Sequence, residues 1–501
     1  MSLQAETVEG FLYPVIECLR AQGHIDSEHQ FTLPICLPMN KIVLLLLFLT
    51  SAAFGQEPVR YQLEYYSGND FLSVTIHIPD DAREQTDMLV IPRSAPGTYA
   101  FTDYSEFVEQ VKATSANGDV LNGERGRGSY FSFATEGRPL TAISYRVDLR
   151  RMESVITAGS ETSKLRDNYL GLLGYSVFGF ADGLADRPVN LEVRTSPDWP
   201  IFSTLSPRLD PQATEAEFAA ASFAELADGQ YLLGKDVQIA KVDGAPIPLF
   251  VAVYSEVEID LNEISRRALM SLDGLADYFG YVPMPHYTMI LEYIVPPTPQ
   301  HNYGFWMEHL NSLTGSNDVA NAVQGFEEKP RIGGIIHHMA HSWVPLRSYG
   351  EGYRPFEWQV APLIETIWLH EGFAWYVSFY NVLDIKDILN FFRETVASAP
   401  DYIKDLSLRD LSRLGSTQYG EDFRIGMNLF SRGALLAHDL DREIQEKTDG
   451  AKSFRDVMLG LLSWTEKHQR AFAYKEIEAI MSESAGVDLS AIWNRWQEPP
   501  Q

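Results

Sequence analysis

Residues 337–341 read His-His-Met-Ala-His, and residues 368–373, after a gap of 29 residues between His341 and Glu371, read Trp-Leu-His-Glu-Gly-Phe. Histidines four residues apart on a helix project from one face, so the imidazoles of His337 and His341 can reach one metal ion. Glu371, on a later helix, can supply a third ligand and leave a fourth position for water. Three protein ligands with one open position are typical of a catalytic zinc site. The sequence therefore predicts one zinc ion on His337, His341 and Glu371.

The residue that follows the first histidine departs from the common pattern. In H-E-x-x-H helices the glutamate takes the proton from the zinc-bound water, but this chain has His338 there. Three roles stay open for His338: a substitute base, a metal ligand paired with His341, or a group without function in a disabled site. A neutral imidazole can accept a proton near neutral pH, whereas a nearby zinc ion disfavours the imidazolium. Since a positioned base contributes about 10²–10⁴-fold, weak or altered activity is expected.

Length and composition restrict the classes of protein that the chain can belong to. The 501 residues are enough for two or three domains with large cores. Hydrophobic residues make up 45% and charged residues 22%, as in an ordinary globular protein. The formal net charge of −28 argues against nucleic acid or an anionic membrane as a partner.

The N-terminal region predicts export. Residues 39–55 combine a short basic start, an apolar run from Ile42 to Leu49 and small residues near Gly55, which is typical of a secretory signal peptide. The run is too short to span a bilayer, so a stable membrane anchor is not expected. Residues 1–38 are then expected to be an upstream over-extension of the reading frame. Both cysteines, Cys18 and Cys36, precede the mature chain, whose predicted location is the periplasm or the extracellular space.

The remaining sequence predicts an α+β protein of several domains. Short alternating runs with turn signals between them, beginning with a hairpin over 60–78, indicate a β-sandwich or saddle-shaped sheet domain at 57–250. A helix over 262–279, a strand over 287–295 and the histidine helix follow at 251–405, in the order of a thermolysin-like catalytic domain. Residues 406–501 carry helical periodicity and predict a helical C-terminal domain.

Several further motifs, taken together and in order, resemble the glycyl aminopeptidase family of zinc peptidases, family 61 of the metallopeptidases, which is related to aminopeptidase N and thermolysin. Residues 92–99, Pro-Arg-Ser-Ala-Pro-Gly-Thr-Tyr, are similar to its P-x-W-x-P-G-S-Y signature, with Ser94 where Trp is usual. Residues 304–309, Gly-Phe-Trp-Met-Glu-His, resemble its G-G-x-E-H segment, and the 29-residue gap before Glu371 is the family's spacing. Residues 431–436 and 440–441 resemble its K-G-A-L…L-D helix.

The resemblance implies roles for the segment at 304–309 and also shows what this chain lacks. Glu308 would hold the free α-amino group of a peptide, with Gly304 and His309 beside it as part of the substrate-binding segment. Family tyrosines that can stabilise an oxyanion align with Leu429 and Phe430, which cannot donate a hydrogen bond. Many members also carry a PDZ domain, which is not expected here.

Two functions follow from these observations. The first is a zinc aminopeptidase-type hydrolase that removes N-terminal residues from peptides, with Glu308 as substrate anchor and His338 as an altered catalytic group. The alternative is a catalytically silent peptide-binding protein on the same fold. Peptides are the expected partners in both cases, and the oligomeric state is left open.

Overall fold

The structure is a computed structural model, and it describes residues 56–209, 214–304, 306–322, 329–354 and 356–499. The predicted over-extension at 1–38, the predicted signal peptide at 39–55 and both cysteines lie outside these residues. Within the described ranges, none of the helices combines the length and the apolar character that a membrane crossing requires.

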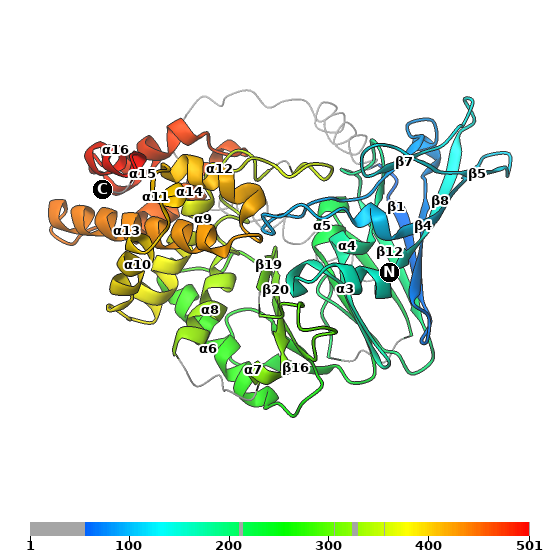
Figure 1. Ribbon diagram of the computed structural model, residues 1–501, viewed down its shortest axis with the longest axis horizontal. Coiled ribbons are helices and arrows are strands. Elements are labelled where there is room, and N and C mark those ends of the chain that lie inside the picture. The colour runs from blue at the N-terminus through cyan, green and yellow to red at the C-terminus, as the bar shows by residue number, and fades with distance from the viewer. Residues whose placement is uncertain (1–55, 210–213, 305, 323–328, 355, 500–501) are drawn as a thin grey trace, which may run out of the picture. The chain divides into compact units, whose positions relative to one another are not determined.

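The N-terminal β region begins with the predicted hairpin. Strands β1 (Val59–Tyr65) and β2 (Phe71–His77) pair antiparallel, with Arg60 opposite His77. Alternate residues of β1 are buried, because successive side chains of a strand point to opposite faces. In the described residues these strands belong to a seven-stranded sheet of order β14-β12-β1-β2-β8-β4-β5 (Figure 1). The other members are β4 (Val108–Ser115), β5 (Val120–Asn122), β8 (Leu140–Asp148), β12 (Val189–Thr195) and β14 (Glu215–Ala220).

Two smaller sheets complete this region. Their strand orders in the described chain are β13-β15-β10-β9 and β11-β3-β7-β6. The three sheets share one apolar core, which includes Leu63, Val74 and Leu191. The strands of the small sheets are β3 (Met88–Val90), β6 (Glu124–Arg125), β7 (Tyr130–Ser132), β9 (Lys164–Arg166), β10 (Tyr169–Leu173), β11 (Phe180–Ala181), β13 (Ile201–Ser203) and β15 (Gln230–Gly234).

A separate mixed sheet supports the metal-site helices. Its order in the described residues is β16-β17-β18-β20-β19, with β18 (Tyr287–Ile294) central and buried along its whole length. The other strands are β16 (Gln238–Val242), β17 (Leu249–Ser255), β19 (Trp306–His309) and β20 (Ser312–Asp318). Because β16 pairs with β17, the sheet begins at Gln238, ahead of the boundary at 251 that the sequence suggests.

Helices pack on this sheet and on one another. The predicted helix over 262–279 is α6 (Leu261–Phe279), which Asp260 caps at its start and Gly280, with φ of 80°, ends. Helix α8 (Lys329–Ala340) carries His337 and His338 and contacts α6, β19 and β20, while α9 (Ile367–Trp375) carries Glu371. A π-helix at Tyr376–Val382 continues α9. The described helices that follow are α10 (Ile388–Ala397), α11 (Asp401–Lys404), α12 (Leu408–Gln418), α13 (Phe423–Lys447), α14 (Phe454–His468), α15 (Ile477–Ala485) and α16 (Ser490–Gln497).

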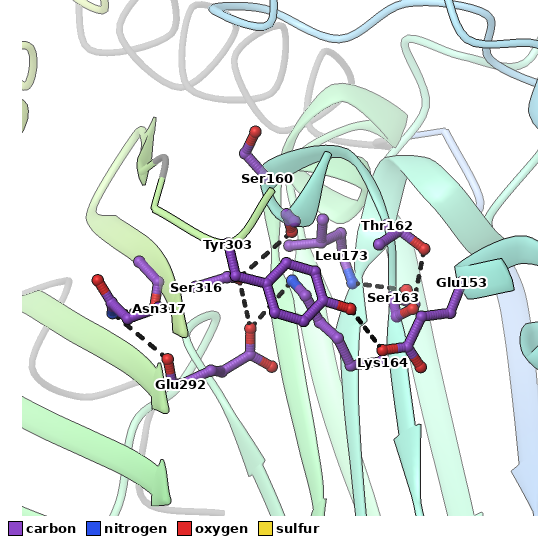
Figure 2. A network of polar contacts seen from close by, with 12 residues as sticks. Glu153, Ser160, Thr162, Ser163, Lys164, Leu173, Glu292, Tyr303, Ser316 and Asn317 are labelled. Atoms are coloured by element: carbon purple, nitrogen blue, oxygen red, sulfur yellow. Dashed lines mark hydrogen bonds and ion pairs between the residues drawn. The ribbon is translucent and has the colours of Figure 1, made fainter. Parts of the chain in front are cut away.

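A buried polar network joins the N-terminal β region to the sheet β16-β17-β18-β20-β19 (Figure 2). Lys164 Nζ of β9 lies 2.9 Å from Glu292 Oε2 of β18, with both side chains at most 2% exposed. Tyr169 Oη and Ser316 Oγ donate to the same carboxylate at 2.7 and 2.8 Å. Since a buried charge is tolerated only when it is paired and hydrogen-bonded, this network holds β9 and β10 against β18 and β20.

The observed architecture confirms the predicted fold class. Mixed sheets form the N-terminal part, a sheet with covering helices forms the middle, and the C-terminal part is helical. The fold places a loop of the N-terminal β region, the edge strand β19 and the helices α8, α9 and α13 around one cleft.

Candidate metal centre and cleft

Three predicted ligand side chains converge on one point. His337 Nε2 lies 3.2 Å from Glu371 Oε2, His341 Nε2 lies 3.3 Å from the same oxygen, and the two imidazole nitrogens are 3.2 Å apart. His341 directly follows α8, and its N–H still donates to the His337 carbonyl at 3.3 Å, so the helical turn keeps both rings on one side. All three side chains are at most 5% exposed.

The spacing and the chemistry of these atoms fit a zinc ion. Ligand atoms that lie about 2.0–2.2 Å from a tetrahedral zinc ion are about 3.3–3.6 Å apart, close to the 3.2–3.3 Å observed here. His341 Nδ1 lies 3.1 Å from the Val344 carbonyl, which can only accept, so Nδ1 carries a hydrogen, and in the neutral ring that binds a metal Nε2 has its lone pair free. A lone pair, a carboxylate oxygen and a second imidazole therefore face one another, as a cation requires.

The electrostatics of the cluster favour positive charge at this point. Burial would raise the pKa of Glu371, but His341 and the contacts with both imidazoles hold this pKa well below its usual range. Burial opposes protonation of His341, yet the charges of Glu308 and Glu371 raise its pKa to about 9. Burial, with the nearby charge of His341, lowers the pKa of His337 to about 3. Two carboxylates thus create a negative potential where the three ligand atoms meet.

Close helix packing sets the position of Glu371. A Cβ on Gly372 would lie 2.4 Å from Gly433 Cα, and one on Gly433 would lie 2.0 Å from the Trp368 carbonyl oxygen. Helices α9 and α13 therefore approach backbone to backbone. The glycine of the 431–436 motif is required because any larger residue would push α9, and Glu371 with it, away from the histidines.

Glu308 presents a second buried carboxylate next to His337, His341 and Glu371, which are called the triad below. Its side chain on β19 is 5% exposed, and its Oε1 has no hydrogen-bond partner among the described residues. Metal-ligand atoms of Glu308, His341 and Glu371 all lie within 4.8 Å of one another. A buried carboxylate with a free oxygen is costly unless a ligand pairs with it.

The structure pairs His338 with Glu308. His338 Nδ1 lies 3.3 Å from Glu308 Oε2, and its side chain is 18% exposed. The ring centroid is 5.9 Å from that of Trp306 and 4.8 Å from that of His337. One nitrogen of the substituted residue is therefore directed at the carboxylate of Glu308, while His337 and His341 meet at Glu371.

A cleft of about 870 Å³ opens over these groups. Carboxylates and aromatic rings dominate its lining, and neither lysine nor arginine appears among the described lining residues. The lining residues used below are Gly97, Tyr99, Glu161, Gly304, Glu308, His337, His338, Glu371, Tyr419 and Phe430.

A loop of the N-terminal region also reaches the cleft, which the sequence reasoning missed. Gly97 adopts φ of 85°, and a Cβ there would lie 2.7 Å from Glu308 Oε1. Tyr99 is 4% exposed and belongs to the apolar core of the metal-site region. Burial, then the charges of Glu371 and Glu308, raises the pKa of the Tyr99 phenol well above its usual value. The Pro-Gly-Thr-Tyr motif was the available signal, but the motif alone gave no position in space.

The remaining predicted residues lie in different surroundings. Gly304 lines the cleft. The imidazole of His309 is 2% exposed, its Nδ1 lies 3.2 Å from Asp228 Oδ1, and it is not among the described lining residues. Leu429 is fully buried in the core, whereas the ring of Phe430 lines the cleft with its centroid 5.8 Å from that of His337.

The fold of this chain is similar to the folds of several solved structures. An aminopeptidase N family protein from Idiomarina loihiensis matches with a TM-score of 0.76 and 18% identity, over 88% of this chain and 76% of that one. A mutant M1 zinc metallopeptidase from Deinococcus radiodurans, bound to a Tyr-Ser-Ala substrate, matches with a TM-score of 0.52 and 14% identity, over 89% and 94% of the two chains. A two-domain M1 zinc metallopeptidase mutant bound to L-tryptophan matches with a TM-score of 0.52 and 13% identity, over 89% of this chain and 96% of that one.

Sequence comparison assigns the first part of the chain. None of the curated proteins matches it, but residues 60–235 match the Peptidase M61 N-terminal domain family. The resemblance that the motifs indicate is thus confirmed for the first part of the chain, which matches the N-terminal domain of family 61, and the fold as a whole is similar to that of the aminopeptidase N group.

Proposed function

We propose that this protein is a metallopeptidase-type hydrolase of the aminopeptidase class that holds the free amino terminus of a peptide beside one zinc ion, with turnover weakened by His338. The observation that carries the proposal is the Glu308 carboxylate, which is buried, has an unpartnered Oε1 and lies within 4.8 Å of the ligand atoms of His341 and Glu371.

The position of Glu308 fits an exopeptidase. In an amino acid the amino nitrogen and the carbonyl carbon are about 2.5 Å apart. A peptide whose ammonium group pairs with Glu308 therefore brings its first carbonyl group to the triad, because the two sites are separated by no more than one residue. The described cleft lining offers no lysine or arginine for a C-terminal carboxylate, which supports binding at the amino end.

Each side chain then has a defined part in the reaction. A zinc ion bound at His337, His341 and Glu371 would polarise the carbonyl group and lower the pKa of water. Glu308 orients the substrate through a charge-assisted hydrogen bond. His338 stands where the base is expected, but its Nδ1 faces Glu308 at 3.3 Å. Only the other ring nitrogen is left to accept a proton from water, and a rigid ring reaches fewer positions than the longer, flexible glutamate.

The pairing of His338 also supports a second candidate, a peptide-binding protein without turnover. If His338 serves only to hold Glu308, the cleft keeps its amine anchor and its metal ligands but has no base. Ligand binding would then persist while hydrolysis is absent.

Three measurements on the purified protein test the proposal. Metal analysis is expected to give close to one zinc per chain. Calorimetry is expected to show binding of a peptide with a free amino terminus and no binding of its N-acetylated form. Hydrolysis of glycyl and alanyl p-nitroanilides is expected to be slow, and to rise by about 10²–10⁴-fold in a His338→Glu variant.

The outcomes separate the candidates. Wild-type hydrolysis as fast as that of His338→Glu would show that the imidazole is an adequate base. Hydrolysis by the variant alone would favour the silent peptide-binding protein for the natural sequence. Equal binding of free and acetylated peptides would remove Glu308 as the anchor and with it the aminopeptidase assignment.

We also propose that the mature protein acts outside the cytoplasm, on the basis of the predicted signal peptide at 39–55. N-terminal sequencing of protein secreted from an expression host tests this, since cleavage near Gly55 is expected.

A further inference from the structure

Tyr99 is held in a strained conformation by the loop that covers the cleft. Its φ is 46°, in the left-handed region that a bulky side chain rarely adopts. Three hydrogen bonds fix the loop. Within it, Ser94 Oγ donates to the Ala100 carbonyl at 3.0 Å, and Thr98 Oγ1 donates to the Ala95 carbonyl at 2.9 Å. The Arg93 N–H donates to the Trp358 carbonyl at 2.7 Å. Backbone strain of this kind persists only where the surroundings enforce it, and it often marks functional sites.

The strained residue buries a hydroxyl group that has no partner among the described residues. Tyr99 is 4% exposed, and its Oη makes no well-formed hydrogen bond among the described residues, although it faces the Glu371 carboxylate. A buried hydroxyl without a partner is unfavourable, so both the backbone and the side chain of Tyr99 carry a cost in the protein alone. Because Tyr99 also lines the cleft, a bound ligand can supply the missing acceptor.

Two neighbouring tyrosines help to define what is special about Tyr99. Tyr353 is fully buried and its hydroxyl is also without a partner in the described chain, but it does not line the cleft. Tyr419 lines the cleft, and its ring centroid is 5.6 Å from that of Tyr99, but it is only partly buried. Tyr99 alone of the three combines a buried, unpartnered hydroxyl with a position on the cleft wall.

From this arrangement we infer that Tyr99 of the N-terminal β region is a catalytic-site residue whose hydroxyl donates a hydrogen bond to the first carbonyl oxygen of the bound peptide. The inference rests on the proposed function, which places that carbonyl group between Glu308 and the triad. The Tyr99 hydroxyl would then supply the carbonyl oxygen with the hydrogen-bond donor that Leu429 and Phe430 cannot provide.

A matched pair of uncleavable ligands tests the inference. One is the ketomethylene analogue of alanyl-alanine, which keeps the carbonyl group but has CH₂ in place of the peptide NH. The other has CH₂ in place of the carbonyl group as well. Both have the same amino terminus for Glu308. Their affinities for zinc-loaded wild type, Tyr99→Phe, Tyr353→Phe and Tyr419→Phe are measured by calorimetry.

Loss of the hydroxyl is expected to weaken binding of the ketone by about tenfold, the usual effect of one net hydrogen bond, and to change binding of the all-methylene ligand less than twofold. Tyr353→Phe and Tyr419→Phe are expected to bind both ligands as wild type does. The ligand-free thermal midpoint of Tyr99→Phe is expected to change little, because the hydroxyl makes no well-formed hydrogen bond in the protein alone.

The contrary results are distinguishable. Equal ketone affinity in wild type and Tyr99→Phe overturns the inference and leaves the proposed function standing. Equal losses for both ligands indicate a structural role and also overturn it, as does a loss in Tyr419→Phe alone. If wild type binds neither ligand, the proposed function fails and the inference fails with it.

Discussion

At the scale of single residues, the proposed zinc site depends on one oxygen of Glu371. Oε2 of this residue lies 3.2 Å from one imidazole and 3.3 Å from the other. Glu371→Gln replaces an anionic ligand with a neutral amide, and zinc affinity is expected to fall by more than about 100-fold, since loss of an outer-shell partner alone reaches that size. Competition with a chromophoric chelator measures the change. Glu161→Gln, which alters another carboxylate of the cleft, should leave zinc affinity unchanged; a similar loss in both variants would point to general electrostatics.

Glu308 makes a separate residue-scale prediction. Glu308→Gln keeps the shape of the side chain but removes the charge that pairs with a peptide ammonium group. Affinity for a peptide with a free amino terminus is expected to fall by about 10- to 100-fold, the range for a charge-assisted hydrogen bond. Zinc content should stay at the wild-type level. Calorimetry and metal analysis on the same preparation check both statements, and unchanged peptide affinity would contradict the anchor role.

The sequence allowed part of this site to be predicted. Spacing along a helix is a local property, so it correctly brought His337 and His341 to one face, and the family spacing located Glu371. Tyr99 and Gly97 were not predicted as site residues, because their position depends on how a loop of one sheet meets the edge strand of another. The contact between His338 and Glu308 likewise arises from the approach of α8 to β19, which no short motif records.

At the scale of elements, the contact between α9 and α13 leaves no room for a side chain. A Cβ at Gly433 would lie 2.0 Å from the Trp368 carbonyl oxygen, so Gly433→Ala is expected to destabilise the protein by about 1–3 kcal/mol and to weaken zinc binding by moving Glu371. Gly334→Ala on α8 is the control, because its Cβ would meet nothing within 4 Å; it should be neutral or slightly stabilising. Urea unfolding of the two variants tests the contrast, and equal stabilities would contradict it.

Element boundaries followed from sequence where capping residues mark them. The helix expected over 262–279 is α6 (Leu261–Phe279), which Asp260 caps and Gly280 ends. Helix α13 begins at Phe423, earlier than the motif at 431–436 and 440–441 indicates, because Phe423 and Phe430 face the cleft and interrupt the usual division into polar and apolar faces. The π-helix after α9 has no sequence signal of comparable strength.

At the scale of the whole molecule, the Lys164–Glu292 ion pair joins the N-terminal β region to the central strand β18 of the sheet β16-β17-β18-β20-β19. Glu292→Gln would leave a buried ammonium group without a counter-charge, and a loss of about 3–5 kcal/mol in unfolding free energy is expected. Glu256→Gln, which removes a partly exposed partner of Arg166 (22% and 18% exposed), should change the unfolding free energy by less than about 1 kcal/mol. Urea unfolding, followed by tryptophan fluorescence, compares the two, and similar losses would contradict a special role for the buried pair.

The same pair predicts how stability depends on pH. Burial raises the pKa of Glu292, but the charge of Lys164 and the hydrogen bonds from Tyr169 and Ser316 lower this pKa by more than burial raises it. The net shift is therefore downward. The folded state therefore binds fewer protons than the unfolded state, and the contribution of Glu292 is present above about pH 4.5. It is lost as the pH falls through the lower folded value. Thermal midpoints between pH 6 and pH 3 should drop less steeply in Glu292→Gln than in wild type, and parallel curves would contradict the assignment.

The residues around the cleft run from Gly97 to Phe430 in the chain. A nascent polypeptide leaving the ribosome therefore holds only part of the reaction centre until most of its length has been translated. Helix α13, which packs backbone to backbone against the helix of Glu371, is among the later elements of the chain. The order of the elements along the chain thus leaves the cleft incomplete until α13 has been synthesised.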